Sequence, residues 1–296
     1  MKPAPFEYQA PASLEAALDA LARHGGDAKL LAGGQSLIPV MNFRLAEPAL
    51  LIDINKLAEL DFIRRDEEGH LRIGALVRQR RLERDPLVAA MAPLLHEAVP
   101  FIAHPQIRNR GTFGGSLAHA DPAAELPALA VALGARFRLQ RAGGDRWVAA
   151  EEFFAGLFAT ALEPDEMLVE AAIPPPPART GWAFLEVARR HGDYAQVGVA
   201  ARVTLDDSGR CREARLVYLS VGDAPVVARE AARLLAGQQL SPEAIAAAAE
   251  KAAGDEMDPL GDIHATPEFK RHLARVLTRR VLQKAGERAR NGANLS

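Results

Sequence analysis

Two short segments of this chain repeat one pattern, in which a glycine pair is followed by a hydroxyl side chain and by residues typical of a helix. The first is Leu30-Leu31-Ala32-Gly33-Gly34-Gln35-Ser36-Leu37, and the second is Arg108-Asn109-Arg110-Gly111-Thr112-Phe113-Gly114-Gly115-Ser116. Glycine reaches positive φ and lets backbone N–H groups approach a ligand that a Cβ atom would hold off. The pattern therefore favours a fold in which two backbone turns are open to a bound molecule.

The chemistry that suits these turns is anion binding. Successive amides in such a turn form a concave site with partial positive charge, and the N-terminus of a following helix adds its dipole. We expect both segments to bind phosphate, with Ser36 and Ser116 as further hydrogen-bond donors. Two matching segments predict one ligand with two phosphates, or one diphosphate bound from both sides. The alternative for a single segment is a tight turn without a ligand, because glycine pairs are common in turns.

Two carboxylates follow the second segment. Asp121 is a good N-cap, Pro122 suits the first helical position, and a helix is predicted over 123–133 up to Gly134. Asp121 and Glu125 would then lie one turn apart and face the same loop. Carboxylates beside a phosphate site are better suited to accept hydrogen bonds from sugar-like hydroxyls than to touch phosphate. The alternative is a capped, solvated helix end.

Composition excludes several classes of protein. The 296 residues predict two or three domains, 49% apolar and 25% charged residues are typical of a globular protein, and the net charge of -2 favours neither nucleic acid nor membrane binding. The single cysteine, Cys211, excludes an intrachain disulfide and an iron–sulfur cluster held by this chain's own thiolates. The N-terminus lacks the apolar core of a signal peptide, and no apolar run is long enough to span a bilayer. A cytoplasmic location is therefore expected.

The chain divides at a run of prolines. Pro174-Pro175-Pro176-Pro177 removes backbone donors and holds the chain extended, which indicates a linker. Domains are predicted over 1–57, 58–176 and 177–290, with a frayed tail at 291–296. Before the linker, two helical stretches are expected, near 80–84 and near 87–99. After it, we expect strands over 183–188, 197–205 and 214–221 and helices over 226–236, 242–253 and 267–289.

Several familiar sites are not supported by the sequence. Neither glycine segment is a Walker A sequence, and no G-x-G-x-x-G is present, so a P-loop NTPase and an ordinary dinucleotide-binding Rossmann site are excluded. His119 and Asp121 lack a third ligand at suitable spacing, so no metal site is expected. A third segment, Arg189-Arg190-His191-Gly192-Asp193-Tyr194-Ala195, is either a solvated turn or a loop whose Tyr194 covers a flat ring.

The residues Ala32–Ser36, Thr112–Ser116 and Arg189–Ala195 resemble the three signature segments of the FAD-binding medium subunit of molybdenum hydroxylases, the carbon monoxide dehydrogenase and xanthine dehydrogenase family. The resemblance extends over essentially the whole chain. It implies an α+β fold: two α/β portions of the vanillyl-alcohol-oxidase (PCMH) type that enclose FAD, and a C-terminal domain of antiparallel sheet and helical bundle.

The resemblance also implies a set of cofactor-binding residues. The two glycine loops would bind the FAD diphosphate, Asp121 and Glu125 the flavin hydroxyls, the backbone near Leu168 the adenine or flavin portion, and Tyr194 would lie near the isoalloxazine. No catalytic side chain and no metal ligand is implied. The loop residues are Leu31, Ala32, Gly33, Gly34, Gln35, Ser36, Leu37, Gly111, Thr112, Gly114, Gly115 and Ser116.

The implied function is electron transfer. A large molybdopterin-binding subunit hydroxylates the substrate, electrons pass through [2Fe-2S] clusters of a small subunit, and FAD in this chain collects them for an external acceptor, in a dimer of heterotrimers. Two alternatives stay open. One is a self-sufficient flavin oxidase or reductase of the same fold, and the other is a non-catalytic nucleotide-binding assembly protein.

Overall fold

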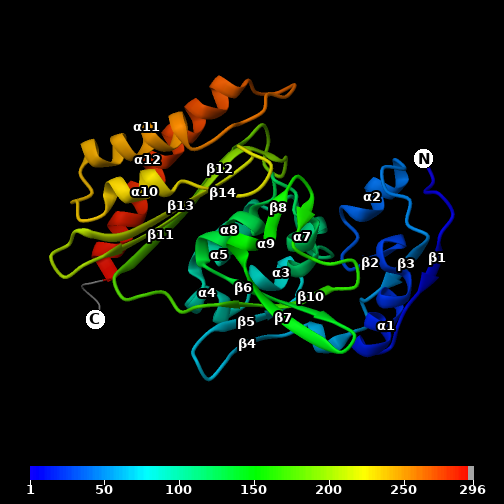
Figure 1. Ribbon diagram of the computed structural model, residues 1–296. Helices are drawn as coiled ribbons and strands as arrows, with labels where there is room; N and C mark the ends of the chain where they lie inside the picture. Colours follow the sequence, from blue (N-terminus) through cyan, green and yellow to red (C-terminus); the bar gives the residue numbers. More distant parts are fainter. Residues whose placement is uncertain (293–296) are drawn as a thin grey trace.

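The computed structural model describes residues 1–292, which form three main sheets with helices packed against them (Figure 1). The N-terminal part begins with α1 (Leu14–His24), where the Ser13 side chain accepts the N–H of Ala16 at 3.2 Å. One face of α1 is buried against a three-stranded parallel sheet. The sheet order is β1 (Glu7–Gln9), β3 (Leu50–Asp53), β2 (Ala28–Leu31). From β2 the chain passes through residues 32–36 into α2 (Leu37–Asn42).

The middle part is an antiparallel sheet with helices on one face. Its strand order is β4 (Ile63–Arg65), β5 (Leu71–Gly74), β10 (Met167–Ile173), β6 (Arg136–Arg141), β7 (Gly144–Ala149). Six helices lie between β5 and β6 in the chain, and every residue of the last one is buried, so it forms the centre of the core. They are α3 (Gln79–Leu82), α4 (Pro86–Met91), α5 (Pro93–Ala98), α6 (Pro105–Arg108), α7 (Phe113–His119) and α8 (Glu125–Leu133). The short elements α9 (Ala150–Phe153), β8 (Phe154–Gly156) and β9 (Ala159–Thr160) follow β7.

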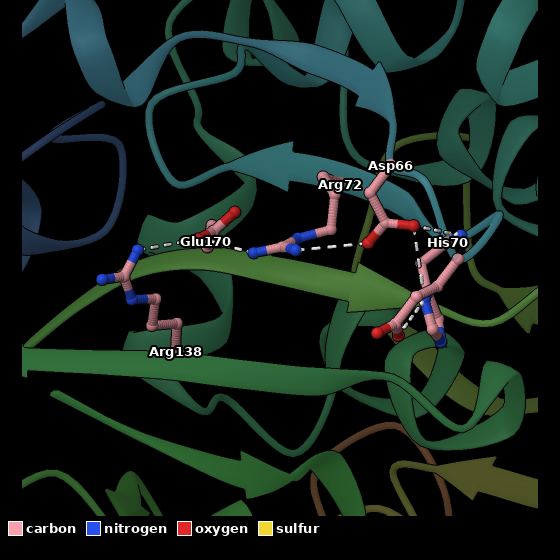
Figure 2. A network of polar contacts seen from close by, with 6 residues as sticks. Asp66, His70, Arg72, Arg138 and Glu170 are labelled. Atoms are coloured by element: carbon pink, nitrogen blue, oxygen red, sulfur yellow. Dashed lines mark hydrogen bonds and ion pairs between the residues drawn. The ribbon is translucent and has the colours of Figure 1, made fainter.

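The opposite face of this sheet is charged. Glu170 lies between two arginines, with Arg72 Nη2 at 2.8 Å and Arg138 Nη1 at 3.2 Å (Figure 2). Asp66 accepts a second contact from Arg72 at 3.2 Å. The arginines offset the cost of burying Glu170, which is only 4% exposed.

The C-terminal part is an antiparallel sheet covered by a helical bundle (Figure 1). Its strands are β11 (Thr180–Ala188), β12 (Ala195–Leu205), β13 (Cys211–Leu219) and β14 (Val226–Val227), and its helices are α10 (Arg229–Leu235), α11 (Pro242–Asp255) and α12 (Pro267–Gly292). The sheet lies between two cores, because alternate residues of β11 face the middle part and the bundle. The four prolines connect β10 to β11.

Three predicted helices differ from the structure. The stretch near 87–99 is broken, because Pro93 disfavours helical backbone at Ala92, which has φ -134 and ψ 60. The helix predicted over 226–236 begins only at Arg229, since Val226 and Val227 pair with β13 as an edge strand. Helix α12 extends past the predicted end at residue 289 and includes residues 291 and 292; the rest of the predicted tail, 293–296, lies outside the described residues.

Candidate functional site

The first glycine segment is a loop with free amide donors. Within residues 1–292, the N–H groups of the five residues from Gly33 to Leu37 have no hydrogen-bond partner, and Gly34 adopts the left-handed conformation with φ 72. Side-chain amides bind two carbonyls of the loop: Asn55 Nδ2 donates to Ala32 O at 2.8 Å, and Gln35 Nε2 donates to Gly33 O at 3.0 Å. Successive unpaired N–H groups are what an anion requires.

The second glycine segment has a different structure from the one predicted. Gly114 and Gly115 form the first turn of α7 with ordinary helical backbone, not a turn at positive φ. Their amides are used internally, since Gly114 N–H donates to Ala75 O at 2.9 Å and Gly115 N–H to Thr112 Oγ1 at 3.1 Å. The reason for glycine is close packing: a Cβ at Gly114 would lie 2.5 Å from Ala75 Cβ.

The two segments lie against each other. A Cβ at Gly33 would lie 2.5 Å from Arg110 O and 2.8 Å from Gly111 Cα, so only glycine allows this contact. Arg78 joins them from below, donating to Arg110 O and, at 2.7 Å, to Asn55 Oδ1. The two loops that the sequence analysis identified therefore contact each other. Arg78 and Asn55 were not identified from the sequence, because nothing marks them there except that they are polar residues after strands.

Asp121 does not cap the predicted helix. Helix α8 begins at Glu125, and the Asp121 carboxylate accepts the N–H of Ala123 at 2.9 Å within the turn between α7 and α8. The charge of Asp121 nevertheless acts on the carboxyl group of Glu125. Burial, and then the charge of Asp121, raises the pKa of Glu125 to about 7.

The third segment approaches these carboxylates. A Cβ at Gly192 would lie 2.4 Å from His104 Cε1, which places the loop against the residues that precede the second glycine segment. Ser220 ties the end of this loop to the turn at Asp121, because its Oγ donates to Ala195 O at 2.7 Å and its N–H donates to Pro122 O at 2.9 Å. Tyr194 is 70% exposed at this position. Partial desolvation of the phenol, and then the charges of Asp121 and Glu125, raise its pKa.

Leu168 lies in the core beside this site. Its strand β10 connects to α7 through Ala75, whose N–H donates to Val169 O at 2.9 Å and whose carbonyl accepts from Gly114. The two glycine segments thus contact each other, and Tyr194 lies close to Asp121 and Glu125.

Two family models match the chain in succession. One, described as the FAD binding domain in molybdopterin dehydrogenase, matches residues 4–176, and the other, described as the CO dehydrogenase flavoprotein C-terminal domain, matches residues 182–285. The chain belongs to the FAD-binding medium subunits of molybdenum hydroxylases. This confirms the family and the cofactor, FAD, that the three signature segments implied.

Relatives of this medium subunit match over nearly its full length. The 6-hydroxypseudooxynicotine dehydrogenase complex subunit alpha of Paenarthrobacter nicotinovorans is 44% identical over 98% of this chain and 97% of its own. The carbon monoxide dehydrogenase medium chain of Hydrogenophaga pseudoflava is 40% identical over 97% of this chain and 99% of its own. Both are subunits of dehydrogenases, in agreement with the predicted oxidoreductase class.

Solved structures show the same architecture. Carbon monoxide dehydrogenase from Hydrogenophaga pseudoflava, in a form that lacks the Mo-pyranopterin moiety, aligns with a TM-score of 0.94 at 40% identity, covering 97% of this chain and 99% of that chain. Quinoline 2-oxidoreductase from Pseudomonas putida 86 aligns with a TM-score of 0.92 at 40% identity, covering 98% and 99%. The expected α+β fold of the medium subunit, an FAD-binding part followed by a sheet-and-helix domain, is confirmed.

The residues of the medium subunit fit FAD. The diphosphate of FAD is an anion, and the loop from Gly33 to Leu37 presents amide donors without partners among the described residues. Within the same residues 1–292, no cluster of three or more His, Cys, Asp or Glu side chains could hold a metal ion. His119 instead packs against Phe158, with ring centroids 5.1 Å apart. No helix in the described chain combines the length and apolar character that crossing a membrane requires.

Proposed function

We propose that this medium subunit takes electrons from [2Fe-2S] clusters of a small partner subunit and passes them through FAD to an external acceptor. A large molybdopterin-binding subunit would complete the assembly, a dimer of heterotrimers. The one cysteine supports this division, because Cys211 is buried in the C-terminal part and a cluster needs several thiolates. The names of the relatives, which are subunits or medium chains of dehydrogenases, support it as well.

The observation that carries the proposal is the apposition of the two glycine segments. The diphosphate is assigned to the free amides from Gly33 to Leu37, with Ala32 and Leu31 behind them. The second segment forms the opposite wall, with Gly111, Thr112, Gly114, Gly115 and Ser116. Asp121 and Glu125 are assigned to the flavin hydroxyls, the Leu168 backbone to the adenine or flavin portion, and Tyr194 to the isoalloxazine.

The chain itself would bind FAD and hold it in a fixed orientation. When bound, FAD supplies the redox chemistry, which the protein tunes through charge and hydrogen bonding. The amide groups of the first loop would hold the anionic end, and Tyr194, which is 70% exposed, would contact the ring. No side-chain nucleophile is required for this role.

The test is reconstitution of the full chain with FAD, alone and with its two partner subunits. Flavin absorbance that stays with the chain through gel filtration is expected. The substrate of the complex should bleach this absorbance only when both partners are present. Bleaching by substrate with the isolated chain would favour a self-sufficient oxidase or reductase, and failure to bind FAD would favour a non-catalytic assembly protein.

We further propose the division into residues 1–57, 58–176 and 177–290 as folding units, and a cytoplasmic location. The proline run between β10 and β11 supports the second boundary, and it separates the ranges matched by the two family models. Limited proteolysis tests the boundaries, and cell fractionation tests the location.

A further inference from the structure

Asn55 lies at the carboxyl end of the N-terminal sheet, beside the first glycine segment. Strand β2 ends at Leu31 and the parallel strand β3 ends at the paired residue Asp53, so the residues that follow the two strands emerge at the same edge. Asn55 Nδ2 donates to Ala32 O at 2.8 Å and to Asp53 Oδ1 at 2.7 Å. Asn55 therefore contacts the loop that presents the free amides.

The side-chain amide of Asn55 has one orientation. Its Nδ2 faces two oxygen acceptors, and its Oδ1 accepts from Arg78 Nη2 at 2.7 Å. A rotation of the amide by half a turn would place its N–H groups against the guanidinium and its oxygen against two other oxygens. Asp53 is itself held by Tyr8, whose hydroxyl donates to Asp53 Oδ2 at 2.6 Å. The Nδ2 group of Asn55 is thus directed at Ala32.

The bond from Asn55 to Ala32 fixes a peptide group of the loop. In a planar trans peptide, the C=O and the following N–H point to opposite sides, and the described chain contains no cis peptide bond. Because Ala32 O faces Asn55, the N–H of Gly33 points away from it. Gln35 acts in the same way on the next peptide, since its Nε2 donates to Gly33 O at 3.0 Å and so directs the N–H of Gly34. Within residues 1–292, neither of these N–H groups has a partner.

Arg78 connects Asn55 to the second glycine segment. Its Nη1 donates to Arg110 O, which is the backbone atom against which Gly33 packs. Asn55 belongs to the N-terminal part of the chain and Arg78 to the middle part. A series of hydrogen bonds that begins at Asp53 and ends at Arg110 therefore crosses between the two parts.

The sheet itself does not depend on Asn55. The ends of β2 and β3 are already joined by backbone, because the N–H of Ile54 donates to Leu31 O at 3.1 Å. The Asn55 side chain instead binds the next carbonyl, that of Ala32, whose peptide group carries the free N–H of Gly33. The contact therefore acts on the loop more than on the strands.

We propose that Asn55 and Arg78 are positioning residues for the diphosphate of FAD. Asn55 fixes the peptide group that directs the N–H of Gly33 to the phosphate, and Arg78 holds the second glycine segment beside this loop. The inference rests on the proposed function, which assigns the diphosphate to these amides. Amide groups that are already held in place lose little conformational entropy when an anion binds, so affinity is gained although neither side chain needs to touch the ligand.

The first experiment measures the FAD affinity of the full chain by isothermal titration. Asn55→Ala should bind FAD at least about tenfold more weakly than wild type, because Ala32 O loses its donor and the peptide group can turn. The control is Asn42→Ala, a half-buried asparagine at the end of α2 and outside this series of hydrogen bonds. It should bind FAD within about twofold of wild type. Equal affinity of Asn55→Ala and wild type would overturn the inference and leave the proposed function standing.

A second variant covers the case in which Asn55→Ala does not fold, as judged by circular dichroism. Arg78→Lys keeps the positive charge but lacks the planar fork that donates to Arg110 O and Asn55 Oδ1 together, so FAD affinity should fall at least about threefold. The control is Arg81→Lys, because Arg81 contacts Asp61 at 2.9 Å, away from both glycine segments. Equal FAD affinity in these two variants would refute the role of Arg78.

The double variant asks whether the two residues act through one another. If they belong to one series of contacts, the loss of FAD affinity in Asn55→Ala with Arg78→Lys should be clearly smaller than the product of the two single losses. The second substitution then removes contacts that the first has already broken. Losses that multiply to within about twofold would show independent action and would refute the connection.

The last experiment uses inorganic pyrophosphate, which is a diphosphate without a flavin. Added pyrophosphate should slow amide hydrogen exchange of segment 30–41 at least about twofold in wild type and Asn42→Ala, but not in folded Asn55→Ala. Mass spectrometry of the digested chain measures the exchange. Equal protection in Asn55→Ala and wild type, or none in wild type, would overturn the positioning role. Failure of every protein to bind FAD, with the expected pyrophosphate pattern, would count against the proposed function and support the positioning role.

Discussion

Gly33 shows how one residue decides whether two distant segments can share a ligand. Its missing side chain leaves room for the backbone of Arg110 and Gly111, which approach closer than any Cβ allows. Backbone cannot move aside as a flexible side chain can. The need for glycine here therefore comes from contact between loops, and at Gly34 from positive φ, although both residues read alike in the sequence.

Gly33→Ala should separate the loops. We expect FAD affinity to fall at least about tenfold and the free energy of unfolding to fall by about 1–3 kcal/mol, because the added methyl group overlaps backbone atoms. Isothermal titration and urea denaturation measure the two effects. The matched control is Gly26→Ala, where an added Cβ meets nothing within 4 Å. Equal FAD affinity in the two variants would remove the first loop from the site.

Tyr194→Ala should affect electron transfer more than binding. The ring is 70% exposed in the absence of ligand, so its removal costs little folding free energy. We expect reoxidation of bound FAD to change about tenfold and FAD affinity less than about threefold, since the loss of a ring face alters solvent access more than the diphosphate contacts. Stopped-flow absorbance measures the rate, with Tyr194→Phe as control. If the stopped-flow traces of Tyr194→Ala were identical to those of the wild type, Tyr194 would lie away from the flavin.

At the scale of elements, polar caps and prolines set the ends of helices. The sequence predicted some of these ends and not others. Ser13 and Ser241 cap α1 and α11 through their hydroxyls, and α11 begins at Pro242, where the sequence predicted it. Asp121 has equal capping chemistry but caps only a turn. Capping propensity is local, whereas the start of α8 depends on burial of its whole surface.

Helix α7 depends on a cap that also orders the second glycine segment. Thr112 is 2% exposed, and its Oγ1 accepts the N–H of Gly115. Thr112→Val should lower the free energy of unfolding by about 1–2 kcal/mol, while Thr112→Ser should keep most of the stability. Urea denaturation at one pH compares them. A Thr112→Ser protein as unstable as Thr112→Val would show that methyl packing, not the cap, stabilises this turn.

At the scale of the whole molecule, one ion cluster joins the middle part to the C-terminal helix. Glu97 of α5 accepts from Lys284 at 2.6 Å and from Arg288 at 2.5 Å, both on α12. Burial alone would raise the pKa of Glu97, but these hydrogen bonds hold it below the ordinary value. Because the folded-state pKa is lowered, the stabilisation is present above the ordinary pKa and is lost as the pH falls through the folded-state value.

Glu97→Gln should loosen this junction. We expect cleavage in the proline linker by a non-specific protease to become several-fold faster at neutral pH, with a loss of about 1–2 kcal/mol in unfolding free energy. Glu250→Gln is the control, because Glu250 contacts Arg275 and Arg279 within the C-terminal part alone. Mass spectrometry of timed digests measures the rate. Equal cleavage of both variants would show that apolar packing holds the parts together without this cluster.

The sequence by itself determined the local features and the family. Glycine pairs, hydroxyls, the proline run and the single cysteine act through their own backbone and side-chain chemistry, so they predict loops, a linker and the absence of a chain-borne cluster. The signature segments then implied FAD, which the family models confirm.

Only the tertiary structure decided how those features combine. The sequence suggested two equal phosphate turns, but Ala75 and Thr112 accept the amides of Gly114, Gly115 and Ser116 in the second segment. The amides from Gly33 to Leu37 in the first segment have no partner within residues 1–292. Asn55 and Arg78 gain their roles from partners far along the chain, in contacts that no local pattern encodes. Burial and charge at the site arise where three parts meet, because both depend on every surrounding atom.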